Sequence, residues 1–186
     1  GVPVLGGSQR SADVASAQAF LASLGPGGAV MVKAVAGGGG RGMRVARNAA
    51  ELDAAWTRSS SEARAAFGNG DLYVEELIAE ARHIEVQIIG DGTDIVHLGE
   101  RECTLQRRHQ KLVEIAPSPT LDAGLRARIT EAAVTMARRV GYRSLGTFEF
   151  LVDAARPDRF VFIEANPRLQ VEHTVTEPVT GLDLVQ

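Results

Sequence analysis

Polar and apolar residues alternate along one stretch of the chain, His83-Ile-Glu-Val-Gln-Ile-Ile89. One face of this stretch carries isoleucine and valine, and the other carries His83, Glu85 and Gln87. A period of two is typical of a strand that is buried on one side. A second apolar run, over 95–100, follows the turn signal Asp91-Gly92. The two runs together therefore predict a β-hairpin.

Outward from this hairpin, the chain reads as short strands and amphipathic helices. Further strands are predicted over 29–35, 43–45, 72–76, 147–152 and 160–164. The last two are joined by a proline-containing turn and can pair as a second hairpin. Helices are predicted over 11–24, 48–67 and 122–140, and Asn48 and Glu51 are spaced as in a capping box. Helices in one block and antiparallel hairpins in others predict an α+β fold.

The composition limits the classes of protein to which the chain can belong. Of its 186 residues, 45% are hydrophobic, which excludes a wholly disordered chain. No stretch approaches the roughly 20 consecutive apolar residues of a membrane span, so we expect no membrane association. The 20 Lys and Arg residues against 23 Asp and Glu offer no general attraction for nucleic acid. The single cysteine, Cys103, fits a reducing compartment, and we expect a cytoplasmic protein.

A run of glycines, Gly37-Gly-Gly-Gly-Arg-Gly42, formally matches the dinucleotide-binding pattern G-x-G-x-x-G. That pattern has to open a helix, whereas Met43-Arg-Val45 is predicted to be a strand. A glycine loop between two strands is instead the geometry of a flap over phosphates, where backbone N–H groups approach an anion. Lys33 on the preceding strand would add a cation. A flexible surface turn stays open as the alternative for the glycine run taken alone.

Two glutamates interrupt apolar strands that can pair with each other. Glu149 lies within Thr147-Phe-Glu-Phe-Leu151, and Glu164 ends Phe160-Val-Phe-Ile-Glu164. Two carboxylates that face each other are costly to bury without a cation, and their oxygens suit Mg²⁺ or Mn²⁺. Asn166 has the same parity as Glu164 and could join them. The alternative is a solvent-facing side of the hairpin, where glutamates need no partner.

Basic residues gather in Gln106-Arg-Arg-His-Gln-Lys111 and again near Asn166-Pro-Arg-Leu-Gln-Val-Glu-His173. Next to metal-binding carboxylates, such a cluster would bind phosphate or a small carboxylate. Taken alone, the first segment favours the alternative of a basic loop in solvent. A single histidine on the polar face of a strand, such as His83, is more often structural than functional.

Taken in order, these segments resemble the biotin carboxylase branch of the ATP-grasp superfamily, found in biotin-dependent carboxylases such as pyruvate or acyl-CoA carboxylases. The likeness runs over essentially the whole chain. The matching segments are Lys33-Ala34, Gly37-Gly-Gly-Gly-Arg-Gly-Met-Arg44, Arg82-His-Ile-Glu-Val-Gln87, Glu100-Arg-Glu-Cys103, Gln106-Arg-Arg-His-Gln-Lys111, Gly146-Thr-Phe-Glu-Phe150, Ile163-Glu-Ala-Asn-Pro-Arg168, Gln170-Val-Glu-His173 and Thr180-Gly-Leu-Asp183.

The resemblance implies an ATP-grasp fold with a small lid subdomain, about 5–77, and an antiparallel-sheet subdomain, about 78–186. In that family ATP lies between lid and sheet and phosphorylates bicarbonate to carboxyphosphate, whose carbon dioxide is captured by biotin. The implied cofactors are ATP, Mg²⁺ or Mn²⁺, and biotin as carrier substrate. The implied partners are a biotin carboxyl carrier domain and a carboxyltransferase. Because family members carry further domains on both sides, we expect this chain to be a central segment of a larger ligase, inactive or incomplete alone.

The resemblance also implies roles for individual residues, including one for His83. Nucleotide contacts fall to Lys33, Gly39, Gly40, His83, His109 and the hinge residues Glu75, Glu76, Leu77 and Ile78, with Glu149 and Glu164 acting through metal. The metal ligands are Glu149, Glu164 and Asn166. The bicarbonate pocket comprises Lys111, Arg168, Gln170 and Val171. Glu172 matches the base that takes the bicarbonate proton, and Arg168 matches the residue that steadies the biotin enolate.

Two departures and two other functions accompany this resemblance. Ala36 stands at the family's first glycine position, and Glu76 stands where the hinge often has lysine. A different ATP-grasp ligase, of carbamoyl phosphate synthetase type, would share most of these motifs. A nucleotide-binding module without turnover is the third hypothesis, since the chain lacks a lysine and an arginine that the family carries in its flanking domains.

Overall fold

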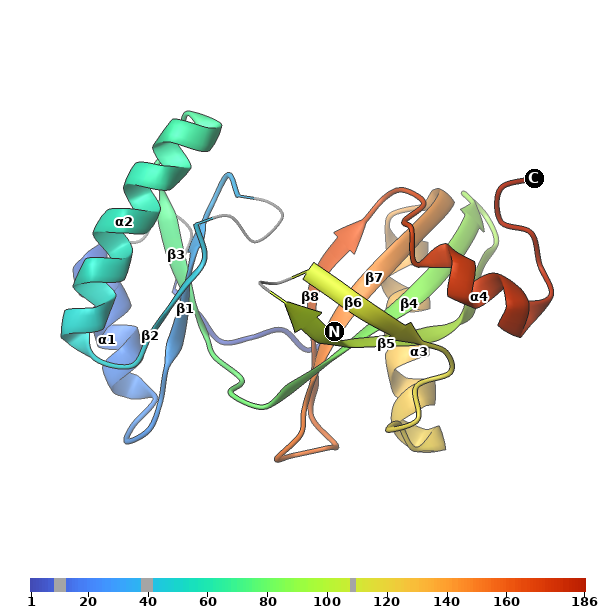
Figure 1. Ribbon diagram of the computed structural model, residues 1–186, viewed down its shortest axis with the longest axis horizontal. Coiled ribbons are helices and arrows are strands. Elements are labelled where there is room, and N and C mark those ends of the chain that lie inside the picture. Colours follow the sequence, from blue (N-terminus) through green and yellow to red (C-terminus); the bar gives the residue numbers. More distant parts are fainter. Residues whose placement is uncertain (9–12, 38–41, 108–109) are drawn as a thin grey trace. The chain divides into compact units, whose positions relative to one another are not determined.

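The computed structural model describes residues 1–8, 13–37, 42–107 and 110–186. Over these residues the chain divides into two compact units. One unit is Leu5–Leu77, and the other combines Gly1–Val4 with Ile78–Gln186. Each unit has its own sheet and its own apolar core (Figure 1).

The unit Leu5–Leu77 is a three-stranded antiparallel sheet with two helices. Its strand order is β2-β1-β3, with β1 (Val30–Ala34) between β2 (Arg44–Ala46) and β3 (Leu72–Glu76). The helices are α1 (Val14–Ser23) and α2 (Ala49–Phe67). Val30 and Val32 are fully buried in the core, so the alternation along β1 turns Lys33 toward the opposite face.

Helix α2 begins at the cap that the sequence predicts. The Asn48 side chain accepts a hydrogen bond from the N–H of Glu51 at 2.9 Å. Glu51 departs from the usual capping box, because its carboxylate accepts from the N–H of Arg47, also at 2.9 Å. The helix ends at Gly68, whose φ of 74° is left-handed and favours glycine.

The second unit is a five-stranded antiparallel sheet with the order β6-β5-β4-β7-β8. Its strands are β4 (Ala81–Asp91), β5 (Ile95–Arg107), β6 (Gln110–Ile115), β7 (Arg143–Asp153) and β8 (Phe160–Asn166). Helix α3 (Ala123–Arg139) precedes β7, and α4 (His173–Thr180) follows β8. The N-terminal segment joins this unit through a parallel bridge between Val4 and Phe162.

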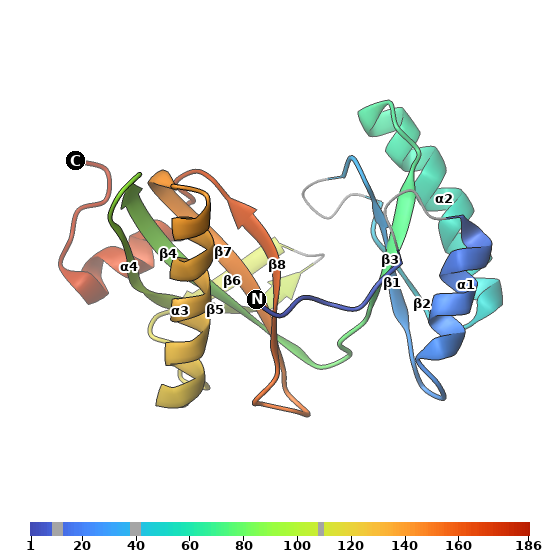
Figure 2. The same cartoon turned by 180° about the vertical axis from the view of Figure 1, so that it is seen from behind.

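The two faces of this sheet differ in chemistry. Ile84, Val86 and Ile88 point to one face and pack with Phe150 and α3 into a continuous core, and Figure 2 shows α3 lying across that side. The same alternation sends the side chains at 83, 85 and 87 to the other face. There, buried charged and polar groups replace the apolar core.

The structure confirms the α+β class, both hairpins and every predicted helix and strand; most boundaries shift by a few residues, and β5 extends seven residues beyond its predicted end. Two elements were not predicted. Strand β6 overlaps the segment 106–111, for which a basic loop was the alternative, by two residues, and α4 lies where no helix was predicted. The helix predicted to reach Val140 ends at Arg139, and Val140 is its C-cap and is 71% exposed. None of the helices in the described part of the chain is both long and apolar enough to cross a membrane.

Candidate functional site

Strand register places three carboxylates side by side on the polar face. Glu85 of β4 pairs directly with Glu149 of β7, and Glu149 pairs with Glu164 of β8. Glu85 and Glu149 are buried, whereas Glu164 is exposed to solvent. Carboxylates in adjacent positions repel each other, so the buried pair needs cations close by.

Lys111 of β6 supplies one of those cations. Its Nζ contacts the Glu85 carboxylate, and it lies 3.0 Å from Glu149 Oε1 and 3.2 Å from Glu172 Oε1. Burial alone would lower the pKa of Lys111, but the charges of Glu85 and Glu149 outweigh it and raise that pKa. The lysine is therefore a fixed positive charge between carboxylates from β4, β7 and the start of α4.

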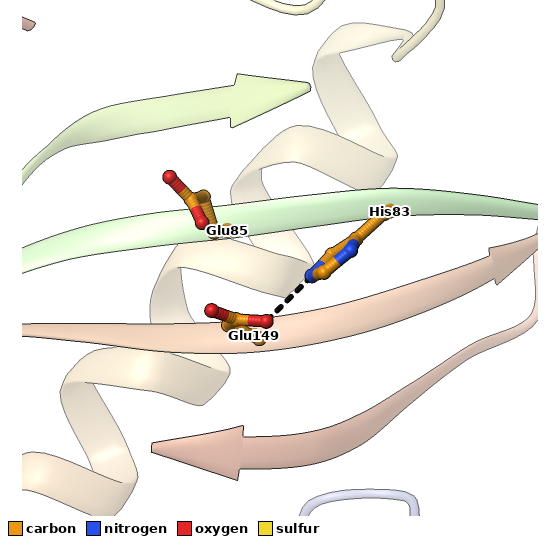
Figure 3. Close-up of side chains that lie close together, drawn as sticks. All are labelled: His83, Glu85 and Glu149. Atoms are coloured by element: carbon orange, nitrogen blue, oxygen red, sulfur yellow. Dashed lines mark hydrogen bonds and ion pairs between the residues drawn. The ribbon is translucent and has the colours of Figure 1, made fainter. Parts of the chain in front are cut away.

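His83 completes the surroundings of Glu149, as Figure 3 shows. His83 Nε2 lies 2.6 Å from Glu149 Oε2, and His83 Nδ1 lies 2.7 Å from Gln106 Nε2. The same Gln106 nitrogen donates to the carbonyl of Cys103 at 2.9 Å, which identifies it as the amide NH₂. Nδ1 of His83 therefore accepts from Gln106, and Nε2 carries the proton that is donated to Glu149.

These contacts set the charge of Glu149. Burial raises the pKa of its carboxyl, but the hydrogen bond and electrostatic attraction from His83, together with the charge of Lys111, outweigh burial and bring the pKa down to about 2. The pKa of Glu172 is also lowered: burial raises it, and its backbone hydrogen bond together with Lys111 outweighs that effect. Both carboxylates are ionised at neutral pH.

The residues predicted as metal ligands converge. The Asn166 amide lies 3.0 Å from Glu149 Oε1 and 3.3 Å from Glu164 Oε1. In this arrangement the amide nitrogen faces the carboxylates, and rotating the amide by half a turn would present its oxygen instead. Carboxylate and amide oxygens in this arrangement fit a hard divalent cation. A second possible group consists of His83, Glu85 and Glu149, whose ligand atoms lie within 4.8 Å of one another.

Three of the predicted bicarbonate residues, Arg168, Gln170 and Val171, occupy the segment between β8 and α4, and the fourth, Lys111, lies on β6. Arg168 is exposed and donates to the carbonyl of Leu169 at 3.2 Å, and Val171 is 83% exposed. Gln170 is buried, and its Oε1 has no hydrogen-bond partner among the described residues. Glu172 is the N-cap position of α4 and faces Lys111. The structure thus brings Lys111 and Glu172 together directly, with the other three on the adjoining loop.

The predicted nucleotide residues of the unit Leu5–Leu77 lie on β1 and at the end of β3. Lys33 forms an ion pair with Glu75, and both side chains are partly buried. The N–H groups of Glu76 and Leu77 donate to the carbonyls of Gly6 and Ala29. Ile78 is buried in the other unit. Gly39, Gly40 and His109 lie outside the described residues.

Two buried charges were missed as site residues. Glu85 was predicted to lie on the polar face of its strand, but no role was assigned to it. The signal that could have identified it is its position two residues from His83, on the same face of the strand. Arg101 pairs with Glu85 across β4 and β5, and neither side chain is exposed. Cys103 is buried, and burial, followed by the charge of Glu85, raises the pKa of its thiol, so it is no nucleophile.

Comparison with known proteins identifies close relatives over the whole chain. A pyruvate carboxylase of Bacillus subtilis is 51% identical over 187 residues, and the mitochondrial pyruvate carboxylase of Homo sapiens is 58% identical over 157 residues. These matches cover 100% and 84% of this chain. They cover only 16% and 13% of the relatives, so the chain spans a small part of each.

Solved structures agree with this likeness. The crystal structure of a Campylobacter jejuni biotin carboxylase in complex with a nucleotide has a TM-score of 0.92 and 49% identity, covering 99% of this chain and 41% of its own. The biotin carboxylase domain of the Hydrogenobacter thermophilus 2-oxoglutarate carboxylase, in complex with MgADP, ADP and bicarbonate, has a TM-score of 0.90 and 46% identity. That match covers 99% of this chain and 40% of its own.

The predicted likeness to biotin carboxylases, and with it the ATP-grasp fold, is confirmed by these neighbours. The family described as the carbamoyl-phosphate synthase L chain, ATP-binding domain, matches residues 1–186. The chain therefore belongs to this family of ATP-binding domains.

Proposed function

We propose that the chain forms the ATP-grasp portion of a biotin carboxylase, which carboxylates biotin with bicarbonate at the expense of ATP through carboxyphosphate. The observation that carries the proposal is Lys111, held between Glu149 and Glu172 on a buried polar sheet face. A ligase of this kind needs a fixed cation for a small anion and a carboxylate base beside it. Relatives that are about 50% identical to this chain are named pyruvate carboxylase and biotin carboxylase.

The two units supply different parts of the reaction in this proposal. The unit Leu5–Leu77 is the lid subdomain and contributes Lys33 to the phosphates, with the segment 75–78 serving adenine through backbone groups. The sheet unit contributes the metal and bicarbonate residues. Phosphoryl transfer depends on alignment and charge neutralisation more than on covalent catalysis. This accounts for a lysine in the unit Leu5–Leu77 and metal-binding carboxylates in the sheet unit.

Glu149, Glu164 and Asn166 would hold Mg²⁺ or Mn²⁺, which neutralises phosphate charge when it is bound. Lys111 and Arg168 would bind the bicarbonate oxygens, with Gln170 and Val171 around them. Glu172 has to reach the bicarbonate proton closely to act as a base, because Lys111 favours its ionised form. Arg168 would also steady the enolate of biotin.

Calorimetry with MgATP tests the nucleotide and metal assignments. Glu164→Ala should weaken MgATP binding markedly, while binding of ATP without divalent metal should change little. Glu131→Ala is the matched control, because Glu131 is an exposed carboxylate of α3 on the opposite side of the sheet. MgATP binding that is equal in Glu164→Ala and the control would remove the metal assignment.

The reaction itself has to be tested in the full-length protein, since the chain spans only part of its relatives. ATP hydrolysis that requires both bicarbonate and biotin is the expected result. Hydrolysis that requires bicarbonate and ignores biotin would favour a carbamoyl phosphate synthetase-type ligase instead. MgATP binding without any turnover would favour a nucleotide-binding module.

The remaining parts of the proposal concern the surroundings of the enzyme. The partners would be a biotin carboxyl carrier domain and a carboxyltransferase, which selects the final acceptor. A cytoplasmic location belongs to the proposal as well. The human relative is named a mitochondrial protein, so fractionation of the source cells is the direct test.

A further inference from the structure

Arg101 of β5 is a fully buried cation outside the predicted site residues. Its side chain is among the largest that are wholly inaccessible to solvent. Burying a guanidinium is costly unless it is paired and its N–H groups are satisfied. Arg101 meets this requirement with hydrogen bonds to the Glu85 carboxylate at 2.5 Å, Gln87 at 2.9 Å, Thr147 at 3.3 Å and Thr176 at 2.8 Å.

One of these contacts leaves the sheet. Glu85 and Gln87 lie on β4 and Thr147 lies on β7, whereas Thr176 belongs to α4. Arg101 therefore ties the buried carboxylate of Glu85 to a helix that packs on the polar face. Because Lys111 also contacts Glu85, the arginine and the lysine share one anchor.

Few interactions hold α4 in place. The helix has eight residues, contains Pro178, and its N-cap Glu172 makes no side-chain capping bond. Thr176 is its one buried residue, 3% exposed, and its hydroxyl oxygen accepts from Arg101. The contact with Arg101 thus reaches the helix that begins next to Glu172, the carboxylate beside Lys111.

We propose that Arg101 is a positioning residue, which acts through Thr176 to hold α4 so that Glu172 stays beside Lys111. The inference rests on the proposed function, in which Glu172 is the base for bicarbonate. The hydrogen bonds of Arg101 reach Glu85, Gln87, Thr147 and Thr176, and none of them involves a predicted nucleotide residue or the segment 167–171. Loss of the hydrogen bond between Arg101 and Thr176 should therefore affect steps that involve bicarbonate and leave nucleotide binding intact.

Thr176→Val and Thr176→Ser form a matched pair for the test. Valine keeps the shape of the side chain and removes the oxygen, whereas serine keeps the oxygen and removes the methyl group. If Thr176 only packs, serine is the more damaging change. If it anchors α4 through Arg101, valine is the more damaging change, and serine restores the wild-type behaviour.

The first measurement is hydrogen exchange on the chain itself, which does not depend on any activity. Thr176→Val should raise the exchange of the α4 amides about tenfold or more, with the amides of β4 and β7 unchanged, and Thr176→Ser should match the wild type. Equal exchange in all three proteins, or faster exchange in the serine variant, would overturn the proposal even if the enzyme proves to be a biotin carboxylase.

The second measurement uses biotin-dependent ATP hydrolysis by the full-length protein. Thr176→Val should lower kcat/KM for bicarbonate about tenfold and leave KM for MgATP within about twofold, and Thr176→Ser should restore both. Equal losses for both substrates would overturn the proposal. Wild-type ATP hydrolysis that does not depend on biotin would refute the proposed function. The hydrogen-exchange measurement would then decide the role of Arg101 in holding α4.

Discussion

Lys111→Met should destabilise the chain, because it removes the cation that three carboxylates share. The side chains of Glu85 and Glu149 are 0% and 4% exposed, so they cannot recover this loss from water. Methionine has a similar length and no polar atoms, and it fills most of the space that the lysine stem occupies. The change therefore isolates the charge from the packing.

The size of the effect follows from the charge state of Glu149. Lowering the pKa of a carboxyl from 4.5 to about 2 corresponds to about 3 kcal/mol in favour of the ionised form. His83 and Lys111 share this effect, so we assign roughly half of it to the lysine. In Lys111→Met, Glu85 still pairs with Arg101, so the loss of the lysine at Glu85 adds little to the destabilisation. We expect a total loss of about 2–3 kcal/mol, toward the lower end of what breaking a buried ion pair costs.

Urea denaturation in buffer without divalent metal measures this loss. Arg107→Met is the matched control, because it removes the same charge from an exposed position on β5 and should cost less than about 0.5 kcal/mol. The folded-state pKa of Glu149 is lowered, so its stabilising contribution is complete above the unfolded value and is lost as the pH falls toward about 2. The difference in free energy of unfolding between wild type and Lys111→Met should thus be largest near neutral pH and smaller in acid. A loss equal to that of the control, or a difference that grows in acid, would refute the reasoning.

Two other predictions concern ion pairs and buried hydroxyls. Glu75→Gln should tighten binding of MgADP by up to about fivefold in calorimetry, because Lys33 is released from its ion pair, which is worth no more than about 1 kcal/mol at a partly exposed position; weaker binding would show that the Glu75 carboxylate helps the nucleotide. Ser118→Ala should cost about 1–3 kcal/mol in urea denaturation, because the buried Ser118 hydroxyl donates to Glu102 at 2.7 Å. A loss below about 0.5 kcal/mol would show that the other donors to Glu102 suffice.

The sequence determined the two faces of the sheet well. Strict alternation over 83–88 put Ile84 and its neighbours in the core and His83 on the polar side, and both placements are observed. Alternation says nothing about whether a polar face meets solvent or other protein groups. For that reason the complete burial of Glu85 could not be predicted from β4 alone.

The groups that contact the polar face of the sheet could not be predicted for a different reason. Arg101 meets Glu85 only because β4 and β5 pair in one register, which shifts at an irregularity between Val86 and Ile88. Such a shift depends on the whole sheet and changes which residues oppose each other. No helix was predicted over the residues of α4, and Pro178 in its interior removes one backbone hydrogen bond, to the carbonyl of Thr174, so local sequence gives the helix little support.

The charges on the polar face also discriminate between the two groups that could hold a metal. Glu85 already receives Arg101 and Lys111, so its oxygens are engaged by two cations. Glu149 shares Lys111 with Glu172, and its other oxygen accepts a hydrogen bond from His83 Nε2. Three buried or half-buried carboxylates thus face two cations, so the group around Glu149 keeps an excess of negative charge. Glu164 adds a further carboxylate there with access to solvent, which a hydrated divalent cation needs for entry. Electrostatics therefore favours Glu149, Glu164 and Asn166 over the more deeply buried group that includes Glu85.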